Sequence, residues 1–287
     1  MEVKRVGIIG CGFMGSGIVQ VCAEAGYIVK TYDINPEMIE KGITGIKKRL
    51  MSKAEKRLIT KKQVELTINR IKHAKEIEDM HDCDLIIEAI KENMDDKKVL
   101  FKRLDGLCPP KTIFATNTSC LSVTEMATAT SRPEKVLGIH FFTPPPLMEG
   151  LEIVETILVD KNTLETAVRF GKSLGKTVFV VKDTPGFIAN ALMIPYVLNA
   201  IRMLENKIAS KENIDVAMVK GLGYPIGPIA LADYFGLDIL YSIAKSMYED
   251  TKDPLLNPPL ILKHMVMAGR LGRKTGKGFY DYDSFNA

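Results

Sequence analysis

The sequence is poor in the residues that build disulfide frameworks and metal sites. It has five cysteines, an odd number with no C-x-x-C pair, and four scattered histidines. We therefore expect neither a disulfide framework nor a metal site. No apolar run approaches the roughly 18 residues that a membrane span needs, so we expect no membrane association. Reduced thiols, and a strand pattern that begins at Val3 and leaves no room for a leader, predict a cytoplasmic protein.

An excess of one charge sign is small over the whole chain but large in one segment. The 287 residues carry 39 Lys and Arg against 35 Asp and Glu, a net charge of +4. Residues 41–75, here called the basic segment, hold twelve basic residues and two acids, which gives the segment +10 and the rest of the chain −6. Such a run is often only a solvated helix face. Nucleic-acid binding is not expected, because interleaved aromatic residues are missing.

Short β-rich runs alternate with helical patterns over the first two thirds of the chain. The runs cover residues 3–9, 27–32, 84–90, 112–116, 136–142, 151–157 and 177–181. This alternation indicates βαβ units and a mostly parallel sheet. After the Pro-Gly pair at 185–186 only helical spacing follows, over residues 187–205, 211–220, 229–248 and 260–268. We predict an α/β domain over 1–184 and an all-helical domain over 185–287.

A glycine motif follows the first strand run. Gly10, Gly12 and Gly15 form G-x-G-x-x-G, in which the glycines allow a tight turn, close approach of a pyrophosphate, and close packing of helix on strand. Asp33 ends the next run, where an acid accepts the ribose hydroxyls and repels a 2′-phosphate. The combination predicts a Rossmann-type domain that binds NAD rather than NADP. A tight turn without a ligand is the alternative.

Few side chains can perform acid–base chemistry near neutral pH. His140 lies near the end of a strand run, at the sheet edge where ligands of open α/β sheets bind. It could take the proton of a substrate hydroxyl, and Glu152, at the start of the next run, could orient it across a turn. A structural histidine with satisfied hydrogen bonds fits the pattern equally well.

Amide and hydroxyl groups stand at two further places. Asn117 and Ser119 follow the run at 112–116 and could hydrogen-bond a substrate oxygen, or could belong to the start of a short helix. Asn190 lies one turn into the first helix after the Pro-Gly break, where an amide more often has only a structural role.

At these residues the chain resembles the L-3-hydroxyacyl-CoA dehydrogenase family, over essentially its whole length. The matching stretches are GCGFMG (10–15), EAIKEN (88–93), ATNTS (115–119), GIHFFTP (138–144), DTPGFIAN (183–190), GYPIGP (223–228) and KTGKGFY (274–280). The resemblance implies reversible, NAD-dependent oxidation of an L-3-hydroxyacyl-CoA, such as 3-hydroxybutyryl-CoA. It also implies a homodimer formed through the helical domain.

The resemblance also implies roles for single residues. His140 matches the general base, Glu152 its carboxylate partner, and Ser119 and Asn190 the residues that hydrogen-bond the substrate. The residues expected to contact NAD are Gly10, Gly12, Phe13, Met14, Gly15, Asp33, Glu92, Lys97 and Asn117. Glu92 and Lys97 match positions beside the nicotinamide-side ribose. Thr143 is expected to contact the acyl group, and Lys53 and Lys56 of the basic segment the CoA phosphates.

The chain departs from the family pattern around the expected acyl site. Thr143 stands where the family usually has Asn, Ala191 where it commonly has Arg, and Glu149-Gly150 reverse one charge and remove one side chain. These changes bear on the substrate more than on the chemistry. Two other functions are considered: a sugar-acid oxidoreductase like L-gulonate 3-dehydrogenase, and a non-catalytic NAD-binding protein like the related lens crystallins.

Overall fold

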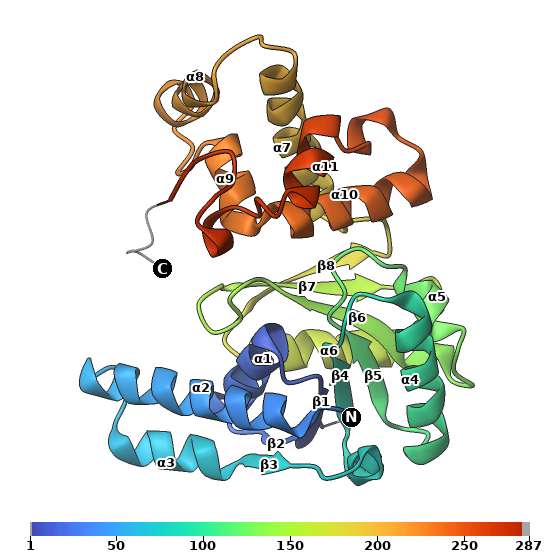
Figure 1. The fold of residues 1–287 in the computed structure, drawn as a ribbon. Helices are drawn as coiled ribbons and strands as arrows, with labels where there is room; N and C mark the ends of the chain where they lie inside the picture. Colours follow the sequence, from blue (N-terminus) through green and yellow to red (C-terminus); the bar gives the residue numbers. More distant parts are fainter. Residues whose placement is uncertain (1, 283–287) are drawn as a thin grey trace. The chain divides into compact units, whose positions relative to one another are not determined.

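The computed structural model describes residues 2–282 and divides into two compact units, Met1–Asp183 and Thr184–Ala287 (Figure 1). The boundary predicted from the sequence, between residues 184 and 185, lies one residue nearer the C-terminus. No helix among the described residues is long and apolar enough to cross a membrane.

The first unit is built on an eight-stranded sheet of order β3-β2-β1-β4-β5-β6-β7-β8. All neighbouring strands are parallel except β6 and β7, which are antiparallel. The strands are β1 (Arg5–Ile9), β2 (Ile28–Tyr32), β3 (Ile71–His73), β4 (Leu85–Glu88), β5 (Ile113–Thr116), β6 (Val136–Phe141), β7 (Gly150–Glu155) and β8 (Thr177–Lys182). The predicted mostly parallel α/β fold is confirmed, although the three-residue β3 lies inside the basic segment, where no strand was expected.

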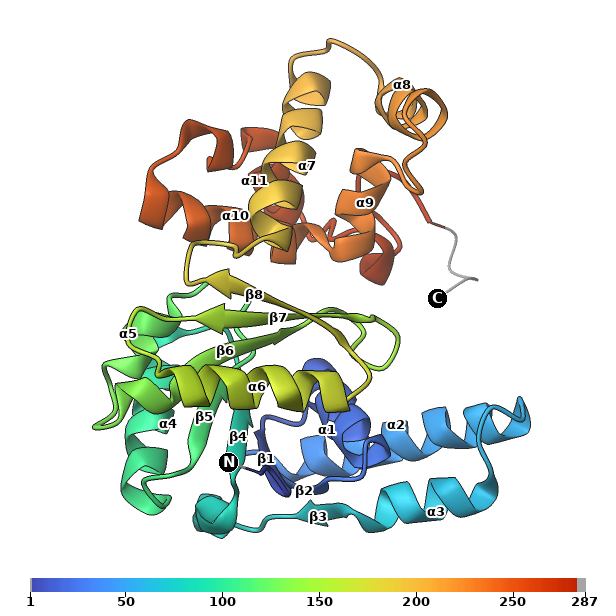
Figure 2. The same cartoon turned by 180° about the vertical axis from the view of Figure 1, so that it is seen from behind.

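Helices cover both faces of this sheet (Figures 1 and 2). They are α1 (Phe13–Glu24), α2 (Pro36–Glu55), α3 (Lys61–Asn69), α4 (Met94–Leu107), α5 (Val123–Ala127) and α6 (Lys161–Ser173). Alternate residues of a strand point to opposite faces, so each strand feeds two apolar cores. Val6 and Ile8 of β1 pack in the core shared with α1, α2, α3 and α6. Ile9 packs in the other core, with Phe101 and Leu104 of α4.

The second unit is helical, as expected, but its helices are shorter than the spacing indicated. They are α7 (Ala189–Glu205), α8 (Lys211–Val216), α9 (Pro228–Phe235), α10 (Leu237–Thr251) and α11 (Leu260–Met267). The single helix expected over 229–248 is wrong, because Gly236 interrupts it with a φ of 98°. The helix expected over 211–220 ends as α8 at Val216 and continues as a π-helical turn, Ala217–Gly221.

Two buried carboxylates tie the last described residues to the helical unit. Asp233 accepts hydrogen bonds from the backbone N–H groups of Phe279 and Tyr280 at 2.9 and 2.8 Å. Asp215 accepts from the Tyr280 hydroxyl at 2.9 Å and from the N–H of Ile229 near the start of α9. The stretch KTGKGFY is therefore held on the helical unit by charge-assisted hydrogen bonds.

All five cysteines are buried. Burial raises the pKa of the Cys83 thiol to about 12 and that of Cys108 to about 11. Burial also raises the pKa values of Cys11 and Cys22. Among the described residues no group of three or more His, Cys, Asp or Glu side chains is placed to hold a metal ion.

Candidate active site

The glycine motif forms an open turn between β1 and α1. Gly10 has a φ of 94°, and a side chain there would collide with the backbone oxygen of Ala89. A side chain at Gly15 would collide with the backbone oxygen of Gly10, so α1 packs against the turn. Around Gly12 the nearest atom to an added Cβ is 4.0 Å away, in the Met38 side chain. The N-cap residue Gly12 offers no side-chain cap, so the start of α1 is shaped to take a phosphate group.

Asp33 closes the turn on the other side. Its Oδ2 accepts the N–H of Cys11 at 2.7 Å, and its Oδ1 accepts the N–H of Asn35 at 2.9 Å. These bonds hold the carboxylate at the end of β2, beside the glycine turn. This is the place where an acid meets the ribose of a bound dinucleotide.

The antiparallel pairing of β6 and β7 brings His140 and Glu152 together. The two residues face each other in the register, and His140 Nδ1 lies 2.5 Å from Glu152 Oε2. The Glu152 side chain has no exposed surface, and that of His140 is 10 % exposed. A carboxylate on Nδ1 fixes the tautomer in which Nε2 carries the lone pair and can accept a proton.

The loop after β5 is tied to this strand. Asn117 Oδ1 accepts the N–H of Phe141 at 2.9 Å, and the Asn117 N–H donates to the Glu88 backbone oxygen at 2.8 Å. The side-chain oxygen of Asn117 is thus used to hold the backbone next to His140. We expected Asn117 to contact the cofactor, and the structure adds this positioning contact.

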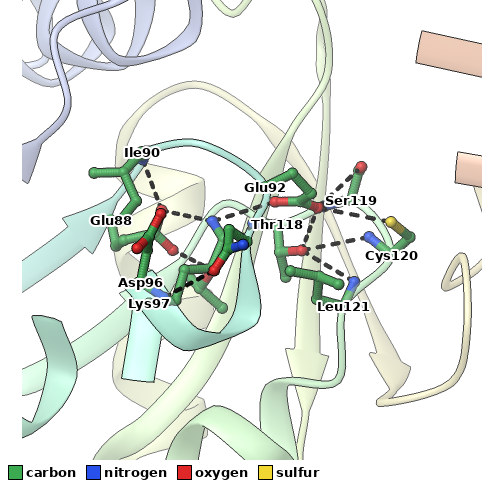
Figure 3. A network of polar contacts seen from close by, with 11 residues as sticks. Glu88, Ile90, Glu92, Asp96, Lys97, Thr118, Ser119, Cys120 and Leu121 are labelled. Atoms are coloured by element: carbon green, nitrogen blue, oxygen red, sulfur yellow. Dashed lines mark hydrogen bonds and ion pairs between the residues drawn. The ribbon is translucent and has the colours of Figure 1, made fainter. Parts of the chain in front are cut away.

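A buried ion network lies at the ends of β4 and β5 (Figure 3). Lys97, 1 % exposed, places its Nζ 2.6 Å from Glu88 Oε1 and 3.2 Å from Glu92 Oε2. Glu88 has no exposed surface and also accepts the Ile90 N–H and the Thr116 hydroxyl, both at 2.7 Å. One ammonium therefore joins two carboxylates.

Glu92 carries the network on to Ser119 (Figure 3). Its Oε1 accepts the Thr118 hydroxyl at 2.5 Å and the Ser119 N–H at 3.0 Å. The Ser119 hydroxyl lies 3.4 Å from the same oxygen. Glu92 and Lys97, both expected to contact the cofactor, are thus in direct contact with each other, and Glu92 also contacts Ser119, which is expected to hold the substrate oxygen.

The two carboxylates of the network differ in acidity. Burial raises the pKa of Glu88, against the effect of the Lys97 ammonium. Burial acts in the same direction on Glu92, but Lys97 and the donors Thr118 and Ser119 outweigh it and lower its pKa. Glu92 is therefore the more firmly ionised of the two.

Comparison with known proteins identifies the family to which these features belong. Residues 5–184 match the model of the 3-hydroxyacyl-CoA dehydrogenase NAD-binding domain, and residues 186–282 match that of the C-terminal domain. The chain belongs to the 3-hydroxyacyl-CoA dehydrogenase family. Its cofactor is accordingly NAD, its substrate an acyl-CoA, and its activity that of an NAD-dependent 3-hydroxyacyl-CoA dehydrogenase.

Relatives and solved structures agree with this assignment over the full length. The chain is 42 % identical to the "Probable 3-hydroxybutyryl-CoA dehydrogenase" of Bacillus subtilis, covering 99 % of each. It is 43 % identical to the mitochondrial hydroxyacyl-coenzyme A dehydrogenase of Sus scrofa, covering 98 % of this chain and 91 % of that one. The structure of (S)-3-hydroxybutyryl-CoA dehydrogenase from Ralstonia eutropha matches with a TM-score of 0.95 and 37 % identity, over 99 % of this chain and 100 % of that one.

Three of the positions that depart from the 3-hydroxyacyl-CoA dehydrogenase pattern, Thr143, Glu149 and Gly150, lie between the end of β6 and the start of β7. Thr143 places its hydroxyl 3.0 Å from the sulfur of Met14, which follows the glycine turn. A Cβ added at Gly150 would meet the Phe142 ring at 3.3 Å and the Phe179 ring at 3.5 Å. The space left by the missing side chain is therefore taken by two aromatic rings, and the Phe142 ring lies 5.1 Å from the His140 ring. Glu149 is exposed.

The remaining predicted residues belong to helices α1, α2 and α7 or follow them directly. Phe13 is exposed at the start of α1. Lys53 is held by Glu24 of α1 at 2.6 Å, whereas Lys56 is exposed at the end of α2. Asn190 is buried in α7 and belongs to the helical unit, where Ala191 follows it.

Two side chains that matter for the site were missed by the sequence reasoning. Glu88 ends an apolar strand run, and an acid in such a run is a signal that it needs a buried partner. Asp183 caps α5, accepting from the N–H groups of Val123 and Thr124 and from the Ser122 hydroxyl at 3.1, 2.6 and 3.1 Å. It stands 59 residues from Thr124 in the sequence, so no local pattern could reveal it.

The placement of Asp33 leads to a test of cofactor choice. Asp33→Ser removes the negative charge that would repel a 2′-phosphate, so kcat/KM for NADPH relative to NADH should rise about tenfold. Steady-state kinetics with both cofactors measure the ratio. The control is Glu37→Gln, an exposed acid in the first turn of α2. An unchanged ratio in Asp33→Ser would contradict the role given to Asp33.

Proposed function

We propose that this chain interconverts L-3-hydroxybutyryl-CoA, or a close short-chain homologue, and its 3-oxoacyl-CoA, with His140 as the general base and acid. The contact between His140 Nδ1 and Glu152 Oε2 carries the proposal. The names of the relatives from Bacillus subtilis and Ralstonia eutropha support the substrate.

The reaction needs a proton acceptor at the substrate oxygen and a hydride acceptor at the same carbon. Bound NAD supplies the hydride acceptor. His140 Nε2 takes the proton from the C3 hydroxyl, and Glu152 stabilises the imidazolium that forms. In the reverse direction the imidazolium returns this proton to the developing alkoxide. Exclusion of water around the buried Glu152 strengthens its interaction with His140.

Ser119 is proposed to hydrogen-bond the C3 oxygen. Its loop is anchored by Glu92, through the Ser119 N–H, and by Asn117, through the backbone beside His140. A loop held at both places keeps the hydroxyl at a constant position relative to His140, as transition-state stabilisation requires. The role of Asn190 in substrate binding remains a prediction from the resemblance.

The basic segment is proposed to attract the phosphates of CoA. Its two helices, α2 and α3, run side by side (Figures 1 and 2). The Lys53 ammonium is already neutralised by Glu24, so the exposed Lys56 is the stronger candidate for a phosphate contact. The +10 charge of the segment also weighs against the sugar-acid alternative, whose substrate lacks the CoA phosphates.

Two further properties are proposed, the assembly of the protein and its compartment. Exposed apolar side chains on the helical unit, among them Leu192, Leu222 and Met267, support a homodimer formed through that unit. An odd number of buried cysteines supports a reducing compartment such as the cytoplasm. The non-catalytic alternative is disfavoured because the His140–Glu152 pair is intact.

The substrate is tested by following NADH absorbance with acetoacetyl-CoA, with a longer 3-oxoacyl-CoA, and in the oxidative direction with L-gulonate and NAD. We expect the highest kcat/KM with acetoacetyl-CoA and no turnover with L-gulonate. A preference for the longer thioester would reject the short-chain proposal. Turnover of L-gulonate alone would reject CoA chemistry altogether.

The role of His140 is tested by His140→Gln, which keeps a polar side chain but removes the proton acceptor. We expect kcat to fall by about 10²-fold or more, the usual scale for loss of acid–base catalysis. The dissociation constant of NADH, measured by fluorescence titration, should stay unchanged. His81→Gln, an exposed histidine on the same unit, is the matched control. Wild-type turnover in His140→Gln would remove His140 from the mechanism.

The phosphate contact is tested by Lys56→Gln and Lys53→Gln. The KM for acetoacetyl-CoA should rise several-fold in Lys56→Gln. It should rise less in Lys53→Gln, because the Lys53 ammonium is already paired with Glu24. A truncated acetoacetyl thioester without the nucleotide should show no change. Lys102→Gln, an exposed lysine of α4, is the control. An equal rise in KM for both thioesters would exclude a contact with the CoA phosphates.

A further inference from the structure

The buried ion network lies between the two parts of the site that the cofactor must join. On the phosphate side, Ala89, which follows Glu88, packs against the glycine turn. A Cβ added at Gly10 would collide with the backbone oxygen of Ala89. On the other side Asn117 binds both the Glu88 backbone and the N–H of Phe141, beside His140. A bound dinucleotide has its pyrophosphate at the glycine turn and its nicotinamide near His140. Its nicotinamide end therefore lies beside this network.

Hydrogen bonding favours the ionised form of Glu88 in this network, against the burial that raises its pKa. Oε1 accepts from Lys97 Nζ and the Ile90 N–H, and Oε2 accepts from the Thr116 hydroxyl. The Thr116 hydroxyl donates its proton to Glu88, and its oxygen accepts the Thr118 N–H at 3.1 Å. Three donors surround the carboxylate, and this arrangement suits the acceptor-only, ionised form.

Glu92 adds a second negative charge and Lys97 the single positive one. Glu92 accepts the Thr118 hydroxyl and the Ser119 N–H, and contacts Lys97 through its other oxygen. Two carboxylates and one ammonium leave the network with one net negative charge. Because Glu88 and Lys97 are excluded from water, salt screens this charge far less than it screens charges on the surface.

We propose that Glu88, through this uncompensated charge, sets the relative affinity of the site for the two oxidation states of NAD. The oxidised nicotinamide ring carries a positive charge and the reduced ring is neutral. A negative charge beside the ring therefore stabilises NAD⁺ and leaves NADH almost unaffected. Glu88 acts at a distance, as a positioning and electrostatic residue, and the inference rests on the cofactor placement of the proposed function.

Glu88→Gln tests this assignment, because it removes one charge and keeps the shape of the side chain. Titration of the protein with NADH, by fluorescence, and with NAD⁺, by calorimetry, gives the two dissociation constants without acyl-CoA. The ratio of the NAD⁺ constant to the NADH constant should rise about tenfold, because the variant removes one negative charge that water and salt screen poorly. The NADH constant itself should change little.

Two further variants complete the test. Glu78→Gln removes an equal charge from a half-exposed ion pair with Arg103 and should leave the ratio at its wild-type value. Glu92→Gln removes the second carboxylate of the network and should shift the ratio in the same direction as Glu88→Gln. If Glu88→Gln does not fold, the Glu92→Gln variant decides the question. Loss of the Glu92 carboxylate also weakens binding of both NAD⁺ and NADH, but the ratio of the two constants still reports the charge.

An equal loss of affinity for both forms, or an unchanged ratio, would overturn the proposal and leave Glu88 a structural residue. A shift in favour of NAD⁺ would overturn it as well. Because the ratio is measured without acyl-CoA, its outcome does not depend on the substrate of the enzyme. Failure to turn over acetoacetyl-CoA would count against the proposed function and would leave this ratio unaffected.

Discussion

The Lys97 ammonium, buried between two carboxylates, is the interaction on which the cofactor side of the site depends. Removal of an ammonium or a carboxylate from water is costly unless close partners replace the lost hydration. Glu88 and Glu92 provide those partners at 2.6 and 3.2 Å. Glu92 can then hold the Ser119 loop, because its second oxygen faces that loop. A single buried cation thereby connects the end of β4 with the loop that follows β5.

The reversal of direction between β6 and β7 has a comparable role on the substrate side. In a parallel pair, the connection would be a long crossover, and the ends of the two strands would lie at the same edge. The antiparallel pair instead places His140, near the end of β6, directly opposite Glu152, near the start of β7. The fold therefore supplies the orienting carboxylate from a neighbouring strand within twelve residues of chain.

Local patterns in the sequence were enough to predict the sheet and the glycine turn, because each depends on strand periodicity or on a short spacing. The pattern left His140 open between a catalytic and a structural role, and its pairing with Glu152 followed from the resemblance to the family. Features that depend on long-range packing were not predictable. Gly236 could stand inside a helix by its spacing, and only its φ of 98° shows that the chain turns there. Lys53 looked like any other basic residue until its ion pair with Glu24 was known. Glu88 needed partners from α4 and β5, which no local motif specifies.

The buried cysteines have a consequence for the life of this enzyme in the cell. Oxidants and electrophiles attack the thiolate, and burial shields Cys11, Cys22, Cys83 and Cys108 and raises their pKa values. Cys11 lies inside the glycine turn, yet its thiol is buried and its pKa is raised. The dehydrogenase thus exchanges electrons with its substrate while these four thiols are kept in their unreactive, protonated form, so oxidative stress should not switch its activity through them.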